Sequence, residues 1–400
     1  MAEAATGPQR LTQLKRAVFL FGLFVLSACS SVVPRTAPPV NTGPAVVAPP
    51  PAPVVMPGLP RDDEHHMVAL LVPLTGTNAG VGKSIANATQ LALLDMNNSE
   101  LRITTYDTAT GAAAAAQRAI DDGARVILGP LLAEDVRTVT PIAKRAGVPV
   151  ISFSNDSSLA GTGAYLMGYS PAQSIERVVD YARDKGISSY GGLVANGVYG
   201  QRASTAFLRA VEAARGQVIS LQNYDRSLPS ITGATKRLGK AGPVGAVLIV
   251  DDGAASAGII PLMRKNGEST AQVLGIERWN AESSLASKPA MNGAWFASVP
   301  DEHYRHYAVK YRARFGAAPY RLSSMGYDSV LLTIRVAQDW RIGAPFPEGR
   351  LRDPGGFVGI DGAFRFGRDG IAERALEVQE IRGGTTVTIS PAPTGFSNDR

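Results

Sequence analysis

The chain has one cysteine, Cys29, and four histidines among its 400 residues. A single cysteine excludes an internal disulfide. His303 and His306 are three positions apart on a predicted helix, but beyond Asp301 and Glu302 they have no acidic or cysteine neighbour. We interpret these two histidines as part of a solvent-exposed helix face. Metal binding by the pair is the alternative.

The sequence also lacks the patterns of nucleic-acid binding and of hydrolytic catalysis. Its formal net charge is +6, but the basic residues are scattered singly rather than gathered with aromatics in a dense run. Nucleic acid is therefore not predicted as a partner. No glycine-flanked serine of the nucleophile type occurs. We predict a protein that is not an enzyme and that binds no cofactor or metal.

The apolar run near the N-terminus is too short to cross a bilayer. Ala17–Leu26 spans ten residues, whereas a membrane helix needs about 20. Arg10, Lys15 and Arg16 precede the run, and small residues follow it. This order of basic, apolar and small residues predicts a secretory signal peptide over residues 1–28.

The sole cysteine follows the predicted signal directly. Leu26-Ser27-Ala28-Cys29 resembles the cleavage motif of bacterial lipoproteins, in which the cysteine sulfur is lipidated and becomes the mature N-terminus. An ordinary signal with a chance cysteine is the alternative. Ser30, rather than an aspartate, follows Cys29, which by the enterobacterial pattern favours the outer membrane. The expected location is the periplasm, on a lipid anchor attached to Cys29.

A proline-rich segment follows the anchor. Residues 34–60 contain ten prolines and one charged side chain, Arg35. Such a composition cannot form a core and favours an extended, polyproline-like linker. We therefore assign residues 29–66 to the lipidated cysteine and its linker.

The stretch Leu74–Ala88 superficially resembles a phosphate-binding loop, because Gly82-Lys83-Ser84 follows an apolar strand and a glycine-rich turn. That loop requires four residues between its first glycine and the Gly-Lys pair. Here five residues separate Gly76 from Gly82, and Thr77 occupies the required position. An exported protein also meets little ATP. We interpret the glycines as a tight turn that leads into a helix beginning at Gly82.

From Met67 onward, short apolar runs alternate with amphipathic helical patterns. Such alternation predicts βαβ units and a parallel, doubly wound sheet. The first series has strands at Met67–Leu71, Leu101–Tyr106, Val126–Leu128 and Val148–Phe153, with helices over 82–97, 112–121 and 136–146. The second has strands at Tyr190–Val194, Gln217–Leu221, Ala246–Val250 and Val273–Ile276, with helices over 198–214, 230–240 and 254–266.

Two more helices, Asp301–Phe315 and Ser323–Ile342, follow the second series, and a turn-rich tail of short strands comes after them. Taken together, the pattern predicts the α/β class with two doubly wound parallel-sheet lobes in succession.

Five segments resemble the type 1 periplasmic binding proteins of the leucine/isoleucine/valine-binding family, in the family's order. They are VALLVPLTGTNAGVGKSIANATQLALLDMN (68–97), RVILGPLLAEDVRTVTPIAKRAGVPVISFSND (125–156), GVYGQRASTAFLRAVEAARGQVI (197–219), FGAAPYRLSSMGYDSVLL (315–332) and VGIDGAFRFGRDG (358–370). The resemblance implies two α/β lobes joined by three crossing segments, with a ligand bound between the lobes.

The resemblance also implies how the chain is divided. We expect crossings near Gly168–Gln173, Ser298–Asp301 and Gly343–Glu348. The expected parts are a first lobe (67–169), a second lobe (170–299), a return to the first (300–343), a return to the second (344–382) and a loose tail (383–400).

Ligands of open α/β sheets bind at the carboxyl ends of the strands. Polar residues directly after predicted strands are therefore the candidate ligand-binding residues, and each could instead cap a turn or helix. The candidates from the first lobe are Thr75, Ser154 and Asn155, and those from the second lobe are Tyr199, Asp225 and Asp252. Asp156, Asn196 and Asp251 occupy similar positions.

Amino-acid binders of the family usually hold the ligand carboxylate with hydroxyls and backbone N–H groups of the first lobe, and the ammonium with an acid of the second. Here Glu134 and Asp156 stand in the first-lobe segments that resemble the family's ligand loops, and both would repel a carboxylate.

Two functions follow as expectations. One is a non-catalytic lipoprotein of the leucine-binding type that binds a small solute, an amino acid or a peptide-like molecule, in the cleft between its lobes. It would serve amino-acid transport through the permease of an ABC transporter, or sensing. The other is an activator of a penicillin-binding protein, because some lipoproteins of that kind carry this fold in their C-terminal domain. Those activators also have an N-terminal domain of helical repeats, and no repeat of about 34 residues occurs in this sequence.

Overall fold

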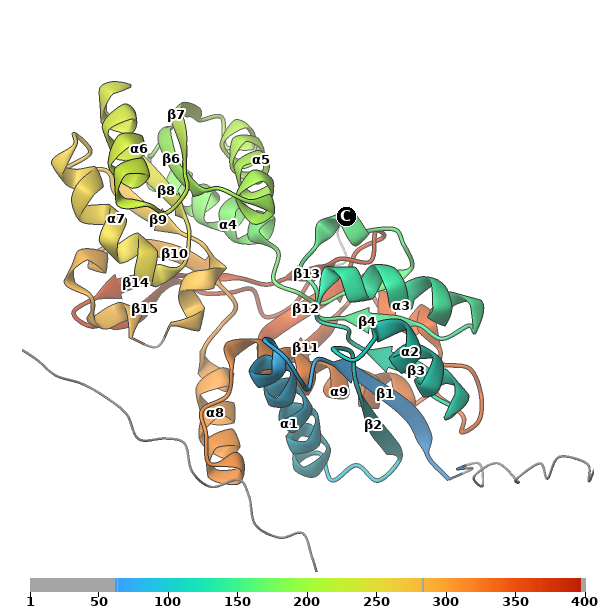
Figure 1. Cartoon of the computed structure of the whole chain (residues 1–400). Helices are drawn as coiled ribbons and strands as arrows, with labels where there is room; N and C mark the ends of the chain where they lie inside the picture. The colour runs from blue at the N-terminus through green and yellow to red at the C-terminus, as the bar shows by residue number, and fades with distance from the viewer. Residues whose placement is uncertain (1–61, 63, 283, 397–400) are drawn as a thin grey trace, which may run out of the picture. The chain divides into compact units, whose positions relative to one another are not determined.

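The computed structural model describes residues 62, 64–282 and 284–396 (Figure 1). The predicted signal peptide, Cys29 and nearly all of the predicted linker lie outside these residues. Within the described ranges, none of the helices is both long and apolar enough to span a membrane.

The first lobe is built around a five-stranded parallel sheet with the order β2-β1-β3-β4-β5 (Figure 1). Its strands are β1 (His66–Val72), β2 (Leu101–Asp107), β3 (Val126–Leu128), β4 (Val150–Ser152) and β5 (Ala164–Leu166). Its helices are α1 (Ala79–Asp95), α2 (Ala112–Asp121), α3 (Ala133–Arg145), α8 (Glu302–Phe315) and α9 (Ser324–Ala337).

Alternate residues of β1 face opposite sides of this sheet. Val68, Leu70 and Val72 belong to a core cluster shared with α1 and α9. Ala69 and Leu71 belong to a second cluster shared with α2 and α3. All five side chains are at most 1% exposed. The side-chain period of two thus explains why a continuous apolar run forms a strand that is buried on both faces.

The second lobe contains a seven-stranded sheet with the order β15-β14-β10-β9-β8-β6-β7. Its parallel strands are β6 (Ser189–Ala195), β7 (Gln217–Tyr224), β8 (Ala246–Val250), β9 (Gln272–Gly275) and β10 (Trp295–Ser298). The antiparallel strands are β14 (Glu377–Arg382) and β15 (Thr385–Ser390). The helices are α4 (Pro171–Asp184), α5 (Val198–Ala213), α6 (Leu228–Lys240) and α7 (Gly253–Lys265).

The predicted fold class is confirmed, and the differences are local. Strands β5 and β10 and helix α4 were not predicted. Helix α1 begins at Ala79 rather than at Gly82. Gly82 therefore lies inside the first turn of α1, where it is buried.

The expected return to the second lobe at residue 344 is wrong. A three-stranded antiparallel sheet, β11 (Phe357–Gly359), β12 (Gly362–Phe366) and β13 (Ala372–Arg374), follows that position. Phe357, Phe364 and Phe366 pack into the core of the first lobe. The chain enters the seven-stranded sheet only at Glu377. Burial of these three aromatic side chains keeps the segment with the first lobe.

The C-terminal tail also differs from the expectation. Residues 383–400 were expected to be loose, but Thr385–Ser390 forms β15, which pairs with β14 along its length. Gly383 and Gly384 make the turn between the two strands, with φ angles of 58° and 84°. Two glycines that accept positive φ allow this tight hairpin.

Replacing Gly82 by alanine is expected to lower the free energy of unfolding by about 1–3 kcal/mol, because the added methyl overpacks a close backbone contact. A Cβ at this position would lie 1.8 Å from the carbonyl oxygen of Pro73. Chemical denaturation of the two proteins measures the difference.

Gly258→Ala is the matched control for this change. Gly258 is exposed in α7, and a Cβ there would meet nothing within 4 Å. This variant is expected to gain about 0.5–1 kcal/mol from helix propensity. Equal behaviour of the two variants would contradict the packing role of Gly82.

Candidate functional site

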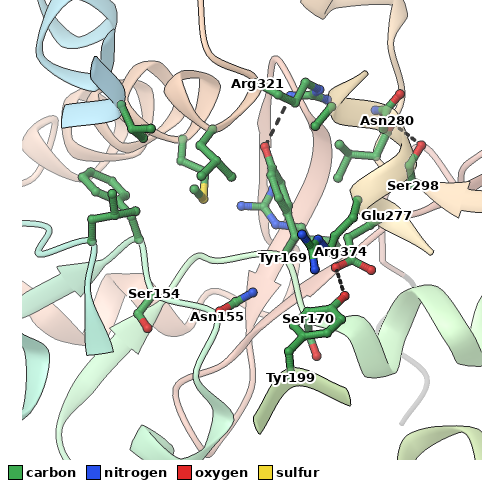
Figure 2. Close-up of a pocket in the computed structure, with 18 of the residues that line it drawn as sticks. Ser154, Asn155, Tyr169, Ser170, Tyr199, Glu277, Asn280, Ser298, Arg321 and Arg374 are labelled. Carbon is green, nitrogen blue, oxygen red and sulfur yellow. Dashed lines mark hydrogen bonds between the residues drawn. The ribbon is translucent and has the colours of Figure 1, made fainter. Parts of the chain in front are cut away.

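A cavity of about 540 Å³ lies between the two lobes (Figure 2). Its walls come from the carboxyl ends of strands in both sheets, as expected for a binding site of this architecture. First-lobe lining residues include Asn78, Val81, Phe153, Ser154, Asn155, Arg321, Met325 and Arg374. Second-lobe lining residues include Gln173, Tyr199, Asp252, Glu277, Arg278 and Asn280. Tyr169, Ser170, Ser298 and Val299 line it where the chain passes between the lobes.

Glu277 is a cavity-lining acid of the second lobe, and one of its carboxylate oxygens has no hydrogen-bond partner in the described structure. It begins a short 3-10 helix, Glu277–Ala281, two residues after β9 ends. Its Oε1 accepts a hydrogen bond of 2.5 Å from the Tyr199 hydroxyl, whereas its Oε2 is buried without a partner in the described structure (Figure 2). Burial raises the pKa of Glu277 to about 7. A buried carboxylate oxygen without a donor favours a ligand that supplies one.

Burial, followed by the nearby Glu277 carboxylate, also raises the pKa of Tyr199 well above its usual value. Tyr199 is therefore a neutral hydrogen-bond donor at every physiological pH. The ring of Tyr199 also lies 5.3 Å from the guanidinium of Arg278. These contacts hold Tyr199 against Glu277 and fix the orientation of the carboxylate.

A buried ionic cluster supports the opposite wall of the cavity. Asp361 accepts hydrogen bonds from Arg321 Nη1 (2.7 Å), the Tyr169 hydroxyl (2.6 Å) and Ser324 Oγ (2.9 Å). Burial alone would raise the pKa of Asp361, but the charges of Arg321 and Arg374 hold it below the usual value. The cluster therefore joins the segment after β11 to the start of α9 and to Tyr169 at the first passage between the lobes.

A second carboxylate ties the same segments together. Asp328 of α9 accepts hydrogen bonds from the backbone N–H groups of Ile360 (2.6 Å) and Asp361 (3.3 Å). Gly359 packs directly on this carboxylate, since a Cβ there would lie 2.3 Å from Asp328 Cγ. Burial, followed by the charge of Asp361, raises the pKa of Asp328.

Four of the six predicted ligand-binding residues line the cavity. They are Ser154, Asn155, Tyr199 and Asp252. Ser154 is buried, and its Oγ accepts a hydrogen bond from the Asp156 backbone N–H. Asp252 caps α7 by accepting a hydrogen bond from the Ala255 backbone N–H, at 2.8 Å. Asp252 therefore lines the cavity and is also the N-cap residue of α7. Capping was the alternative role considered for each of the predicted residues.

The other two predicted residues are not among those lining the cavity. Thr75 is exposed, and its hydroxyl donates a 2.7 Å hydrogen bond to Asp107. Asp225 is exposed and accepts a hydrogen bond from the Ser227 backbone N–H at 2.9 Å. Both residues stabilise loops, which is the ordinary role of threonine and aspartate at such positions.

The expected repulsion of a ligand carboxylate by Glu134 and Asp156 is not supported. Glu134 is exposed, and neither residue lines the cavity. Asp156 forms ion pairs with Arg137 (3.0 Å) and Arg202 (2.6 Å). Asp251, which also follows a predicted strand, is paired as well, because Arg226 lies 2.6 Å from its carboxylate.

The ion pair between Asp156 and Arg202 connects the lobes, because Asp156 follows β4 and Arg202 belongs to α5. Burial alone would raise the pKa of Asp156, but hydrogen bonds from Ser158 and Arg202 lower it to about 2. The carboxylate is therefore ionised throughout the physiological pH range, and the pair links the two lobes.

Arg202→Gln is expected to weaken ligand binding by up to about fivefold, since partly exposed ion pairs contribute at most about 1 kcal/mol. The same change should increase the radius of gyration measured by small-angle X-ray scattering. Arg209→Gln on the exposed face of α5 is the control. A loss of affinity shared by both variants would contradict a specific role for Arg202.

Glu277, Arg321 and Arg374 line the cavity but were not predicted from the sequence. Glu277 directly follows the predicted strand Val273–Ile276. It could therefore have been chosen as a candidate in the same way as the other polar residues that follow predicted strands. Arg321 and Arg374 carried no comparable signal. Arg321 lies in a 3-10 helix before α9, and Arg374 ends the short strand β13.

Two lobes of doubly wound sheets with a polar cavity between them define a class of ligand-binding proteins. A family model described as periplasmic binding protein matches residues 67–385 of this chain. The chain therefore belongs to the periplasmic binding protein family. The members that it resembles are binding proteins, and the family implies a periplasmic location.

One curated relative is an uncharacterized protein of Rickettsia prowazekii (strain Madrid E), which is 24% identical over 180 residues. The match covers 44% of this chain and 48% of the relative, so the chain spans about half the length of that protein.

Solved structures confirm the fold. A candidate branched-chain amino acid ABC transporter protein of Rhodospirillum rubrum has a TM-score of 0.72 and 18% identity, and the match covers 81% of this chain and 100% of that one. The C-domain of LpoA from Haemophilus influenzae, described as a regulator of PBP1A, has a TM-score of 0.63 and 18% identity. That match covers 80% of this chain and 99% of the C-domain.

Proposed function

We propose that this chain is a non-catalytic periplasmic binding lipoprotein of the leucine-binding type. It binds a small solute that carries an amine, such as an amino acid or a short peptide, in the cavity between its lobes. The bound solute is passed to the permease of an ABC transporter or is sensed. Cys29 carries the lipid, and the proline-rich segment tethers the folded part to the outer membrane.

The single observation that carries this proposal is the unpaired Oε2 of Glu277 in the cavity. An ammonium group has three hydrogen-bond donors and a positive charge. It would therefore supply both the donor and the opposite charge that the Glu277 carboxylate lacks. Ser154, Asn155, Tyr199 and Asp252 complete the proposed set of polar contacts around the solute. Thr75 and Asp225 are left out of it, because the Thr75 hydroxyl donates to Asp107 and the Asp225 carboxylate accepts from the Ser227 backbone N–H.

Closure of the lobes around the solute is the proposed mechanism. The cavity takes residues from both lobes, so a solute that contacts both stabilises the closed arrangement. The Asp156–Arg202 pair contributes to the same equilibrium. A ligand shifts the equilibrium between open and closed lobes only if it binds the closed state more tightly than the open one.

A second candidate function is activation of a penicillin-binding protein. The similarity to the C-domain of a regulator of PBP1A favours it, because nearly all of that domain is covered. In this alternative the surface of the lobes, rather than the cavity, carries the function. Glu277 would then be dispensable for activity.

Thermal denaturation of the full chain in detergent, against a panel of amino acids, short peptides and cell-wall fragments, tests the proposal. A solute at 100 times its Kd should add about 2.7 kcal/mol to the free energy of unfolding, a shift of several degrees in Tm. A shift with one class of amine-bearing solute supports the receptor function. No shift with any solute, together with capture of a penicillin-binding protein by the immobilised chain, would favour the activator instead.

A further inference from the structure

Helices α2, α3, α8 and α9 of the first lobe end with basic side chains at one edge of its sheet. Helices α1, α2 and α3 connect parallel strands, so they end at the edge where those strands begin. Lys310 of α8 lies 2.9 Å from Asp95 at the end of α1, and the two helices lie side by side (Figure 1). Trp340, just after α9, stacks on His66 at the start of β1, with ring centres 4.1 Å apart. We define the basic edge by the cations in the last turns of these helices, Arg118, Lys144, Arg145, Arg312, Arg314 and Arg335.

The basic edge carries an excess of positive charge. Its six cationic side chains are exposed, and none takes part in an ion pair among the residues that the structure describes. Arg125 and Arg341, also exposed, lie beside them. The exposed acids next to these helix ends and to the starts of β1 and β2 that stand outside ion pairs are Glu64, Glu100, Asp121 and Asp122. Basic last turns complement the helix dipole, so charge alone does not identify a partner.

Exposed apolar side chains at the same edge supply the second observation. Leu94 and Met96 at the end of α1 are 56% and 46% exposed, and Ile342, two residues after Trp340, is 46% exposed. Cations beside exposed apolar groups suit a lipid surface, because the cations bind phosphates while the apolar groups enter the interface. The predicted linker also joins β1 at this edge.

We propose that the basic edge docks on the surface of an anionic membrane. Its arginines and lysines bind the phosphate groups of lipid head groups, and Leu94, Met96 and Ile342 enter the interface beside them. The inference goes beyond the proposed function, because it concerns the surface on which the first lobe rests and not the solute in the cavity. The cavity lies at the opposite, carboxyl ends of the strands and stays open to solution when the basic edge is covered.

Hydrogen–deuterium exchange of the full chain tests the proposal. The chain is reconstituted by detergent removal into vesicles of phosphatidylcholine alone, or of phosphatidylcholine and phosphatidylglycerol in equal parts. Amides at the ends of α1 and α8 should exchange at least about fivefold more slowly on the mixed vesicles, the factor expected from one basic residue at an anionic surface. At 1 M salt, which screens charges beyond about 3 Å, the difference should disappear.

Replacements at the edge separate the charges from the apolar groups. Arg312→Gln combined with Arg314→Gln should weaken docking by about fivefold for each lost charge. Arg264→Gln combined with Lys265→Gln is the matched control, because it removes two exposed cations from the last turn of α7 in the second lobe. Leu94→Gln combined with Met96→Gln should reduce the protection without changing its salt dependence. All of these side chains are exposed, so the fold is retained.

Equal exchange on the two kinds of vesicle would overturn the proposal. Protection that persists in 1 M salt and in the Arg312 and Arg314 variant would also overturn it, as would an equal loss in that variant and in its control. Protection of the edge by soluble peptidoglycan fragments, with no difference between the vesicles, would assign the surface to a cell-wall polymer and contradict membrane docking.

Discussion

Glu277→Gln is expected to weaken the binding of an amine-bearing solute by about 30-fold or more, because one partner of a buried charge pair is lost. The replacement keeps the shape of the side chain and can still accept the hydrogen bond from Tyr199. It removes the negative charge that would face the ammonium group. Isothermal titration calorimetry of the two proteins at pH 8 measures the difference.

The same residue predicts how binding depends on pH. Because burial raises the pKa of Glu277 to about 7, the empty site is increasingly protonated below that pH. An ammonium group binds the ionised form, so the affinity should fall as the pH falls, approaching tenfold per pH unit. Glu277→Gln should show no such dependence.

The free energy of unfolding of the empty protein depends on pH in the opposite direction to the ligand affinity. A folded-state pKa above the usual value of 4.5 means that the folded protein holds the proton more tightly than the unfolded chain. The contribution of Glu277 to stability is therefore present below pH 4.5 and is lost as the pH rises toward 7. A bound ammonium group compensates for this loss.

Glu212→Gln, on the exposed face of α5 in the same lobe, is the matched control. It removes the same charge without touching the cavity. Binding that is unaffected by Glu277→Gln, or affected equally by both replacements, would contradict an amine site at Glu277.

Asp361→Asn is expected to reduce the free energy of unfolding by about 3–5 kcal/mol, the usual effect of breaking a buried ion pair by removing one partner. Asp361 is fully buried, and Arg321 is 8% exposed. Without the carboxylate charge of Asp361, the buried guanidinium of Arg321 loses its ion-pair partner, and that of Arg374 loses a nearby negative charge. Denaturant unfolding monitored by circular dichroism measures the change.

The control for this prediction is Asp339→Asn, which breaks an ion pair of the same chemistry at the surface. Side chains of Asp339 and Arg350 are 54% and 60% exposed, so the expected effect is below about 1 kcal/mol. If the two replacements cost the same, the buried cluster does not stabilise the passage between the lobes in the way described.

Much of the fold follows from local sequence patterns. The apolar run of β1 predicts a strand buried on both faces, and each sheet uses such strands. Residues after these strands meet at one edge of each sheet, which is why Ser154, Asn155, Tyr199 and Asp252 were predicted and line the cavity. The rule does not distinguish residues that face the cavity from those that cap a turn, so Thr75 and Asp225 were included.

Residues that return from distant parts of the chain could not be predicted in this way. Arg374 donates to Met167 across 207 positions, and Arg321 pairs with Asp361 across 40. Their place in the cavity depends on β11–β13 packing with the first lobe. Short strands with mixed aromatic and charged residues carry no signal for which lobe they join.

Native mass spectrometry of the full chain, incubated with a mixture of amino acids and released from detergent, tests the central claim most directly. The account predicts that one solute carrying an amine is retained by each molecule, and that Glu277→Gln loses it. Retention of no solute, or equal retention by Glu277→Gln, would contradict a binding site built on Glu277.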